Sequence, residues 1–214
     1  MTHRGRETRE RIVLSAARLF QESGVSATSV DEILRAAGAG KGQFYRYFES
    51  KERLVSAVVS HRVEGYLAGQ LEALERIETW EELESYLSGL VAGHEERGFL
   101  GGCPVGALAL ELAGEDEDLR RQLAEALAGW QGSLRLGLRG LIDRGLLRDD
   151  AVPERLATSL LATIQGAYLL STVHRDGDVM AEALQEALSH LRAHAETPGA
   201  AAGTPGDPSV GGTF

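Results

Sequence analysis

The chain has 214 residues, 43% of them hydrophobic, which suits one or two domains with a sizeable core, and its formal net charge is −10. Its single cysteine excludes an internal disulfide framework and a zinc site built from cysteines. The charged start and the lack of a run of roughly 20 apolar residues exclude a secretory signal and a membrane span, so we expect a cytoplasmic protein without a membrane partner.

The chain begins with basic residues. We expect residues 1–7 to form a flexible basic arm, in which Arg4 and Arg6 either follow the minor groove or backbone of DNA or are simply solvated. A first helix is predicted over about 8–23, where apolar residues recur at helical spacing before Gly24.

Residues 24–54 read as two short helices joined by a tight turn. Ser29 and Glu32 have the spacing of a capping box, and Gly38 suits the left-handed end of the helix that follows. The second helix is predicted from Gly40 or Lys41 to about Tyr47. A packed hairpin is the alternative, but the polar side chains fall on the wrong face for it.

The second helix separates into two faces. Phe44 and Phe48, at i and i+4, are predicted to face inward, whereas the other side chains are rich in hydrogen-bond donors. Lys or Arg can meet guanine and Gln can pair with adenine in the major groove, while hydroxyls can bind phosphate. The predicted DNA-binding residues are Thr28, Ser29, Lys41, Gly42, Gln43, Tyr45, Arg46, Tyr47 and, at the start of the next helix, Lys51.

The remainder is predicted to be helical as far as residue 195. A helix over 51–75 is followed by a capping box at Thr79, and Pro153 suits a first helical position. Residues 196–214 have the composition of a disordered tail. Further helices are predicted over 79–96, within 100–114, and over 116–144, 153–174 and 178–195.

Residues 8–54 resemble the DNA-binding domain of the TetR family of bacterial transcriptional regulators. The resemblance implies an all-α chain of about nine helices. It also implies a three-helix, helix-turn-helix DNA-binding domain over 8–53 and an effector-binding and dimerisation domain over 54–195. The matching residues are Ala16, Leu19, Phe20, Gly24, Thr28, Ser29, Val30, Ile33, Ala37, Gly38, Phe44, Tyr45, Phe48, Ser50, Lys51 and Glu52.

In this family the last two helices form a four-helix bundle with their counterparts in a second copy. A homodimer would place two recognition helices one DNA turn apart, ~34 Å, and so raise affinity and specificity. The alternative is that the apolar residues of these helices only close the core of the monomer. The predicted interface residues are Leu156, Leu160, Ile164, Ala167, Leu184, Leu188 and Leu191.

The middle of the chain is predicted to hold a small organic effector, although each candidate residue also suits ordinary core packing. The segment GGCPVGALALELAG resembles the Gly-Cys-Pro subgroup of the family, which includes LmrA/YxaF-type repressors with flavonoid-like aromatic effectors. The candidate pocket residues are Tyr66, Tyr86, Leu90, His94, Phe99, Cys103, Leu108, Trp130, Leu134 and Tyr168.

Cys103 offers an alternative switch. A position near a helix N-terminus would lower the pKa of its thiol, as suits a redox or electrophile sensor, whereas inert packing is the simpler interpretation. A remote alternative is an enzyme that uses Cys103 and His94, but no third orienting residue, phosphate loop or metal-ligand cluster accompanies them. No cofactor is indicated.

Charge separates the two predicted domains. Residues 1–53 contain ten Lys and Arg against seven Asp and Glu, a net +3, which leaves −13 for the remainder. A basic head can meet phosphates while an acidic body repels them, although acidity alone also keeps a domain dispersed. This charge division fits what the resemblance implies, a ligand-responsive DNA-binding regulator that acts as a repressor on double-stranded operator DNA.

Overall fold

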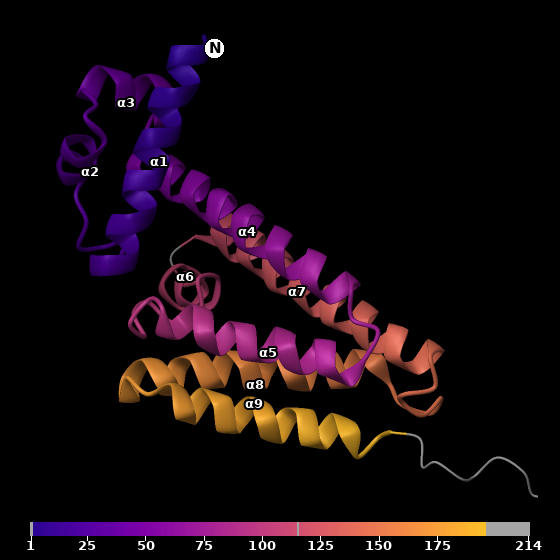
Figure 1. Cartoon of the computed structure of the whole chain (residues 1–214). Coiled ribbons are helices and arrows are strands. Elements are labelled where there is room, and N and C mark those ends of the chain that lie inside the picture. Colours follow the sequence, from indigo (N-terminus) through magenta and orange to yellow (C-terminus); the bar gives the residue numbers. More distant parts are fainter. Residues whose placement is uncertain (1, 115, 196–214) are drawn as a thin grey trace, which may run out of the picture.

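The computed structural model describes residues 2–114 and 116–195, and this part of the chain is built of helices without a strand (Figure 1). This confirms the prediction of an all-α chain with about nine helices. The predicted tail over 196–214 lies outside the described residues. The helices are α1 (His3–Ser23), α2 (Val30–Ala37), α3 (Lys41–Phe48), α4 (Lys51–Glu75), α5 (Trp80–Glu95), α6 (Gly106–Leu112), α7 (Glu117–Asp143), α8 (Pro153–His174) and α9 (Gly177–Arg192).

The first helix begins earlier than predicted. Oγ1 of Thr2 accepts a hydrogen bond from the backbone N–H of Gly5, and α1 starts at His3. The hydroxyl of Thr8 donates to the carbonyl of Arg4 at 3.0 Å in the next turn. The prediction of an arm was therefore wrong for residues 3–7, because arginine and glutamate form helix readily behind a threonine cap.

The turn between α2 and α3 is built by the predicted caps. The N–H of Glu32 donates to Oγ of Ser29, and the N–H of Ser29 donates back to Oε2 of Glu32 at 2.8 Å. Gly38 has φ of 59° and ends α2 in the left-handed region. Gly40 has no side chain that could cap α3. Its backbone N–H donates to Oε1 of Gln43 at 3.0 Å, so the side chain of Gln43 supplies the contact at this helix start.

Helices α1 to α3 form a small unit, here called the head, at one end of the molecule (Figure 1). Phe44 and Phe48 of α3 face inward as predicted, with their ring centroids 5.7 Å apart. They share a buried core with Ile12 and Phe20 of α1 and Ile33 of α2. The inward phenylalanines leave the opposite face of α3 exposed.

The body consists of α4 to α9, and α4 joins it to the head (Figure 1). Helix α4 lies along α7, while α7 also packs against α6 and α8, and α9 packs against α8 and α5. Trp130 in the middle of α7 is fully buried. The body core therefore gathers side chains from helices that lie on both sides of α7.

The predicted dimer interface lies inside the protomer. Helices α8 and α9 pack against each other and against α7 and α5, so the inward faces of this pair are core. The interface prediction was wrong for these residues, and the monomer-core alternative describes them. Each is at most 7% exposed: Leu156, Leu160, Ile164, Ala167, Leu184, Leu188 and Leu191.

Helix α8 nevertheless keeps an apolar outer face. Leu169 and Leu170 are 56% and 47% exposed, and Val173 is 71% exposed. By length and composition alone α8 could cross a membrane, which the sequence analysis overlooked. Its other face is packed into the body core, as in a core helix of a globular domain.

Candidate nucleic-acid interface and effector site

The outer face of α3 carries most of the predicted DNA-binding residues. Lys41, Gly42, Gln43, Tyr45 and Arg46 are all exposed, because Phe44 and Phe48 turn the opposite face of the helix into the head core. Tyr47 is half-buried, with its ring edge-on to Phe48. The structure thus brings six of the nine predicted residues onto one short helix.

Two of these side chains already have partners within the head. Nζ of Lys41 lies 3.1 Å from a carboxylate oxygen of Asp31 on α2, and both side chains are exposed. The side-chain oxygen of Gln43 caps α3, which leaves its amide nitrogen for other contacts. Arg46 takes part in no ion pair with any residue that the structure describes.

The other three predicted residues shape the turn that precedes α2. Thr28 is buried, and its hydroxyl donates to the carbonyl of Gly24 at 2.7 Å, so its side chain is engaged within the head. Ser29 is engaged in the capping box. Nζ of Lys51 donates to the carbonyl of Val25 at 2.7 Å and so ties the start of α4 to this turn.

Contacts between head and body were missed by the sequence analysis. The carboxylate of Glu111 on α6 accepts hydrogen bonds from the N–H groups of Val25, at 2.6 Å, and Ser26. The guanidinium of Arg62 on α4 donates to the carbonyl of Ala17 and, at 2.7 Å, to the side chain of Gln21 on α1. These hydrogen bonds join residues more than 40 positions apart, so no local sequence pattern predicts them.

Four of the aromatic pocket residues form two hydrogen-bonded pairs that meet through a ring contact in the body. Nε1 of Trp130 donates to the hydroxyl of Tyr86 at 2.9 Å, and the hydroxyls of Tyr66 and Tyr168 lie 3.3 Å apart. The rings of Tyr66 and Trp130 meet edge to face at 5.3 Å. Burial raises the pKa of Tyr66 and of Tyr86, so both phenols stay protonated at neutral pH.

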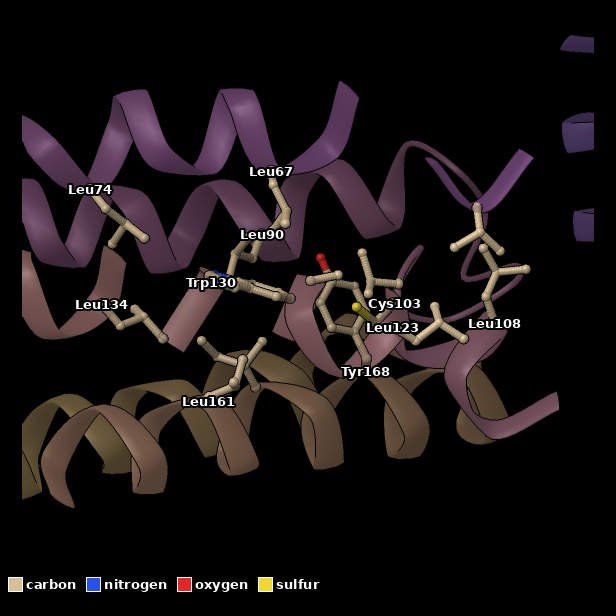
Figure 2. Close-up of a cluster of buried hydrophobic side chains, with 14 of the residues drawn as sticks. Leu67, Leu74, Leu90, Cys103, Leu108, Leu123, Trp130, Leu134, Leu161 and Tyr168 are labelled. Carbon is tan, nitrogen blue, oxygen red and sulfur yellow. The ribbon is translucent and has the colours of Figure 1, made fainter. Parts of the chain in front are cut away.

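The predicted apolar residues frame this group without forming one compact lining. Leu108 and Leu134 lie at opposite ends of the cluster in Figure 2, with Cys103 and Tyr168 between them. Leu90 is also buried there, and with Tyr86 it borders a surface hollow between α4 and α5. The hollow thus lies beside one member of the aromatic group, while Tyr66 is half-buried on α4.

His94 lies at the end of α5, completely buried. Its Nε2 is 3.2 Å from the hydroxyl of Thr172, and its ring meets those of Tyr168 and Phe99 edge-on, at 4.9 and 5.4 Å. Burial, with a smaller effect of the positive Arg97, lowers the pKa of His94. The imidazole is therefore neutral at pH 7.

Cys103 does not have the environment of a reactive thiol. It is buried in the loop before α6, and burial raises the pKa of its thiol although the N–H of Gly106 donates to Sγ. The expectation of a lowered pKa near a helix N-terminus was wrong, because desolvation outweighs that hydrogen bond. In this state the thiolate is disfavoured.

Two family profiles match the chain. Residues 12–58 match the profile described as bacterial regulatory proteins of the tetR family. Residues 79–187 match the profile described as a tetracyclin repressor-like C-terminal domain. The first match covers most of the head and the start of α4, and the second covers the body from the cap of α5 into α9.

The chain is similar to known regulators over most of its length. It is 34% identical over 177 residues to an uncharacterized HTH-type transcriptional regulator in the lacX 3′ region of Lactococcus lactis, which covers 82% of this chain and 88% of that one. It is 29% identical over 180 residues to the HTH-type regulator YxaF of Bacillus subtilis, with coverages of 82% and 90%. The solved structure of Escherichia coli NemR in its reduced form matches with a TM-score of 0.77 at 26% identity, covering 90% of this chain and 98% of that one.

Proposed function

Because this chain belongs to the TetR family of bacterial regulatory proteins, we propose that it is a cytoplasmic, homodimeric repressor that leaves its operator when a small organic molecule binds in its body. It is a DNA-binding transcriptional regulator and not an enzyme, like the relatives that it matches. The observation that carries the proposal is the form of α3, which buries two phenylalanines and exposes Lys41, Gln43, Tyr45 and Arg46.

We place α3 in the major groove. An α-helix fits that groove, and the exposed Arg46 suits guanine while the phenol of Tyr45 suits a phosphate oxygen. Lys41 exchanges its exposed contact with Asp31 for DNA at little cost, because such surface ion pairs are weak. Thr28 and Lys51 support this helix indirectly, since they fix the turn before α2.

We place the dimer contact on the outer face of α8. TetR-family regulators act as dimers, and Leu169, Leu170 and Val173 form an exposed apolar face on a helix whose other side is core. Pairing α8 and α9 with their copies across a two-fold axis would bury this face. The two heads would then be positioned to read successive major-groove turns, ~34 Å apart.

We assign the aromatic group around Tyr66, Tyr168 and Trp130 as the effector site. The two head–body contacts provide the coupling, because α6 holds the turn before α2 through Glu111 and α4 holds α1 through Arg62. A ligand that separates the body helices alters both contacts and thereby the angle of the head. Operator affinity then falls in proportion to the ligand's preference for the shifted state.

The alternative of a repressor switched at Cys103 predicts a different response. Since the thiol is buried and its pKa is raised, we expect quinones or peroxide to release DNA no faster from the wild-type protein than from Cys103→Ser. A gel shift after brief oxidant treatment measures this. Release from the wild type alone would favour the thiol switch over reversible ligand binding.

The proposed function is tested by a gel-shift titration of the full chain against the DNA upstream of its own gene, at two salt concentrations. We expect one discrete complex that survives competitor DNA and weakens as salt rises. A chain that bound every DNA alike, and lost all binding to competitor, would contradict a specific regulator. Sedimentation of the same sample reports whether the complex contains two copies.

A further inference from the structure

Two donor atoms of one guanidinium in the body are buried without an acceptor. Nε and Nη2 of Arg97, which follows α5, are both shielded from solvent and form no hydrogen bond. Arg97 also pairs with none of the acidic side chains that the structure describes. Buried donors without an acceptor destabilise a fold, so this pair of donor atoms points to a missing acceptor such as an anion.

The two unpartnered donors of Arg97, Nε and Nη2, have the geometry that binds both oxygens of a carboxylate. Nε and Nη2 lie on the same edge of a guanidinium and donate in parallel. The same two atoms of Arg120 bind both oxygens of Glu117, at 2.8 and 2.7 Å, and those of Arg148 bind both oxygens of Asp150. In Arg97 alone of these three, both donors are buried and free.

Two further buried polar atoms without partners belong to neighbouring side chains. They are Nδ1 of His94, a residue with no exposed surface, and Nε2 of Gln165 on α8. His94 and Tyr168 are close enough to Arg97 for its charge to affect their pKa values, and Gln165 lies beside Cys103. The unsatisfied groups thus share one region of the body, close to Cys103 and Tyr168.

The surroundings of these groups are aromatic, and the segment that covers them is strained. The rings of Phe99 and Tyr168 meet that of His94 edge-on, so the unpartnered atoms lie beside aromatic side chains. Gly98, Gly101 and Gly102 have positive φ, and so does Phe99 at 60°, where a side chain is disfavoured. The loop before α6 therefore holds backbone strain at Phe99, next to His94.

We propose that the effector is an aromatic carboxylate whose two oxygens bind Nε and Nη2 of Arg97 and whose ring lies among His94, Phe99 and Tyr168. The assignment rests on the proposed function, because it takes the body as the effector site. An anion bound to Arg97 would also influence the head through Arg62. The charge of Arg97 acts on Arg62, whose guanidinium holds α1, so an anion on Arg97 changes the field at that contact.

Titration of the full-length protein with benzoate, and separately with the neutral isostere benzamide, tests this site when the arginine Nε–H resonances are followed by NMR. We expect the Arg97 resonance to shift saturably with benzoate and not with benzamide. Arg97→Lys, which keeps the charge but loses the fork, should weaken benzoate binding about tenfold or more. Arg120→Lys, an exposed arginine with the same geometry, is the matched control and should change nothing.

An Arg97 resonance that did not respond to benzoate, or equal benzoate affinity in the wild type and Arg97→Lys, would overturn the proposal. Thermal unfolding of the unliganded variant shows that it is folded. Specific DNA binding is measured on the same samples. A wild-type protein that bound no specific DNA would refute the proposed function as a DNA-binding regulator. Intact DNA binding without an Arg97 response would refute only the carboxylate site.

Discussion

Arg46 and its neighbours on α3 differ in how free they are to meet DNA. Lys41 is paired with Asp31 and Gln43 caps its own helix, whereas Arg46 is exposed and makes no ion pair with the residues that the structure describes. Replacing Gln43 would therefore remove a predicted base contact and a helix cap together, so the two effects on DNA binding could not be separated. Arg46 gives the cleaner test of base reading.

Arg46→Ala is expected to reduce discrimination between a specific site and scrambled DNA by ~1–3 kcal/mol, the range for a bidentate base contact. Fluorescence anisotropy with both DNAs measures the difference. Arg139→Ala removes an exposed arginine from α7, where it pairs with Asp143, and serves as the control. Undiminished sequence preference in Arg46→Ala would remove this residue from the base contacts.

His94 makes stability depend on pH in a definite direction. Burial, and secondarily Arg97, lower its pKa below the ordinary 6.5, so below pH 6.5 the unfolded chain binds a proton that the folded chain resists. The free energy of unfolding contributed by His94 is therefore fully present above pH 6.5 and is lost as pH falls toward the lower folded-state pKa.

Urea unfolding of the wild type and His94→Gln at pH 7.5, 6.5 and 5.5 measures this contribution. We expect the stability of the wild type relative to the variant to be greatest at pH 7.5 and to shrink at pH 5.5. A difference that stayed constant over this range would show that His94 titrates alike in both states.

Helix α6 acts as a link because Glu111 faces the head rather than solvent. Glu111→Gln keeps the shape of the side chain and removes its charge, so the hydrogen bonds from Val25 and Ser26 weaken. We expect the Val25 and Ser26 amides to exchange hydrogen about tenfold faster, which corresponds to ~1.4 kcal/mol. Glu117→Gln, an exposed acid at the start of α7, is the control, and unchanged exchange in Glu111→Gln would contradict the link.

The helices themselves were largely predictable because their ends are encoded locally. Ser29 with Glu32, Thr79 with Glu82 and the proline at 153 each mark a start that the structure confirms. The start of α1 was missed because the cap at Thr2 stands in a charged stretch without apolar periodicity. The contacts of Glu111 and Arg62 could not be predicted, since they depend on how α4 and α6 pack against the head.

The assembled molecule depends on which side of α8 is left uncovered. Periodicity identified its apolar residues but not their partners, so Leu160 and Ile164 were assigned to the dimer and proved to be core. Four of the candidate pocket residues, Tyr66, Tyr86, Trp130 and Tyr168, do lie in contact with one another, while their role as an effector site stays a prediction. Large aromatic side chains on different helices of one domain pack together in its core, because few other positions bury them. A helix with two apolar sides can turn either side to the core, so its pattern does not identify the side that faces a partner.

The double substitution Leu169→Glu and Val173→Glu is expected to convert the dimer to a monomer, because four charges would be placed in the proposed contact. Light scattering with size-exclusion chromatography measures the mass. Leu136→Glu, at a half-exposed position on α7, is the control. A dimer that persisted in the double variant would locate the contact on another face.

In the proposed assembly, two copies of this chain read one symmetric DNA site through α3. Selecting bound sequences from random double-stranded DNA with the full chain, followed by footprinting of the enriched sequence, tests it most directly. We expect two inverted half-sites about one helical turn apart, or a multiple of that spacing, and their loss from the selection with Arg46→Ala. Enrichment of no sequence, or of the same sequence by wild type and Arg46→Ala, would contradict it.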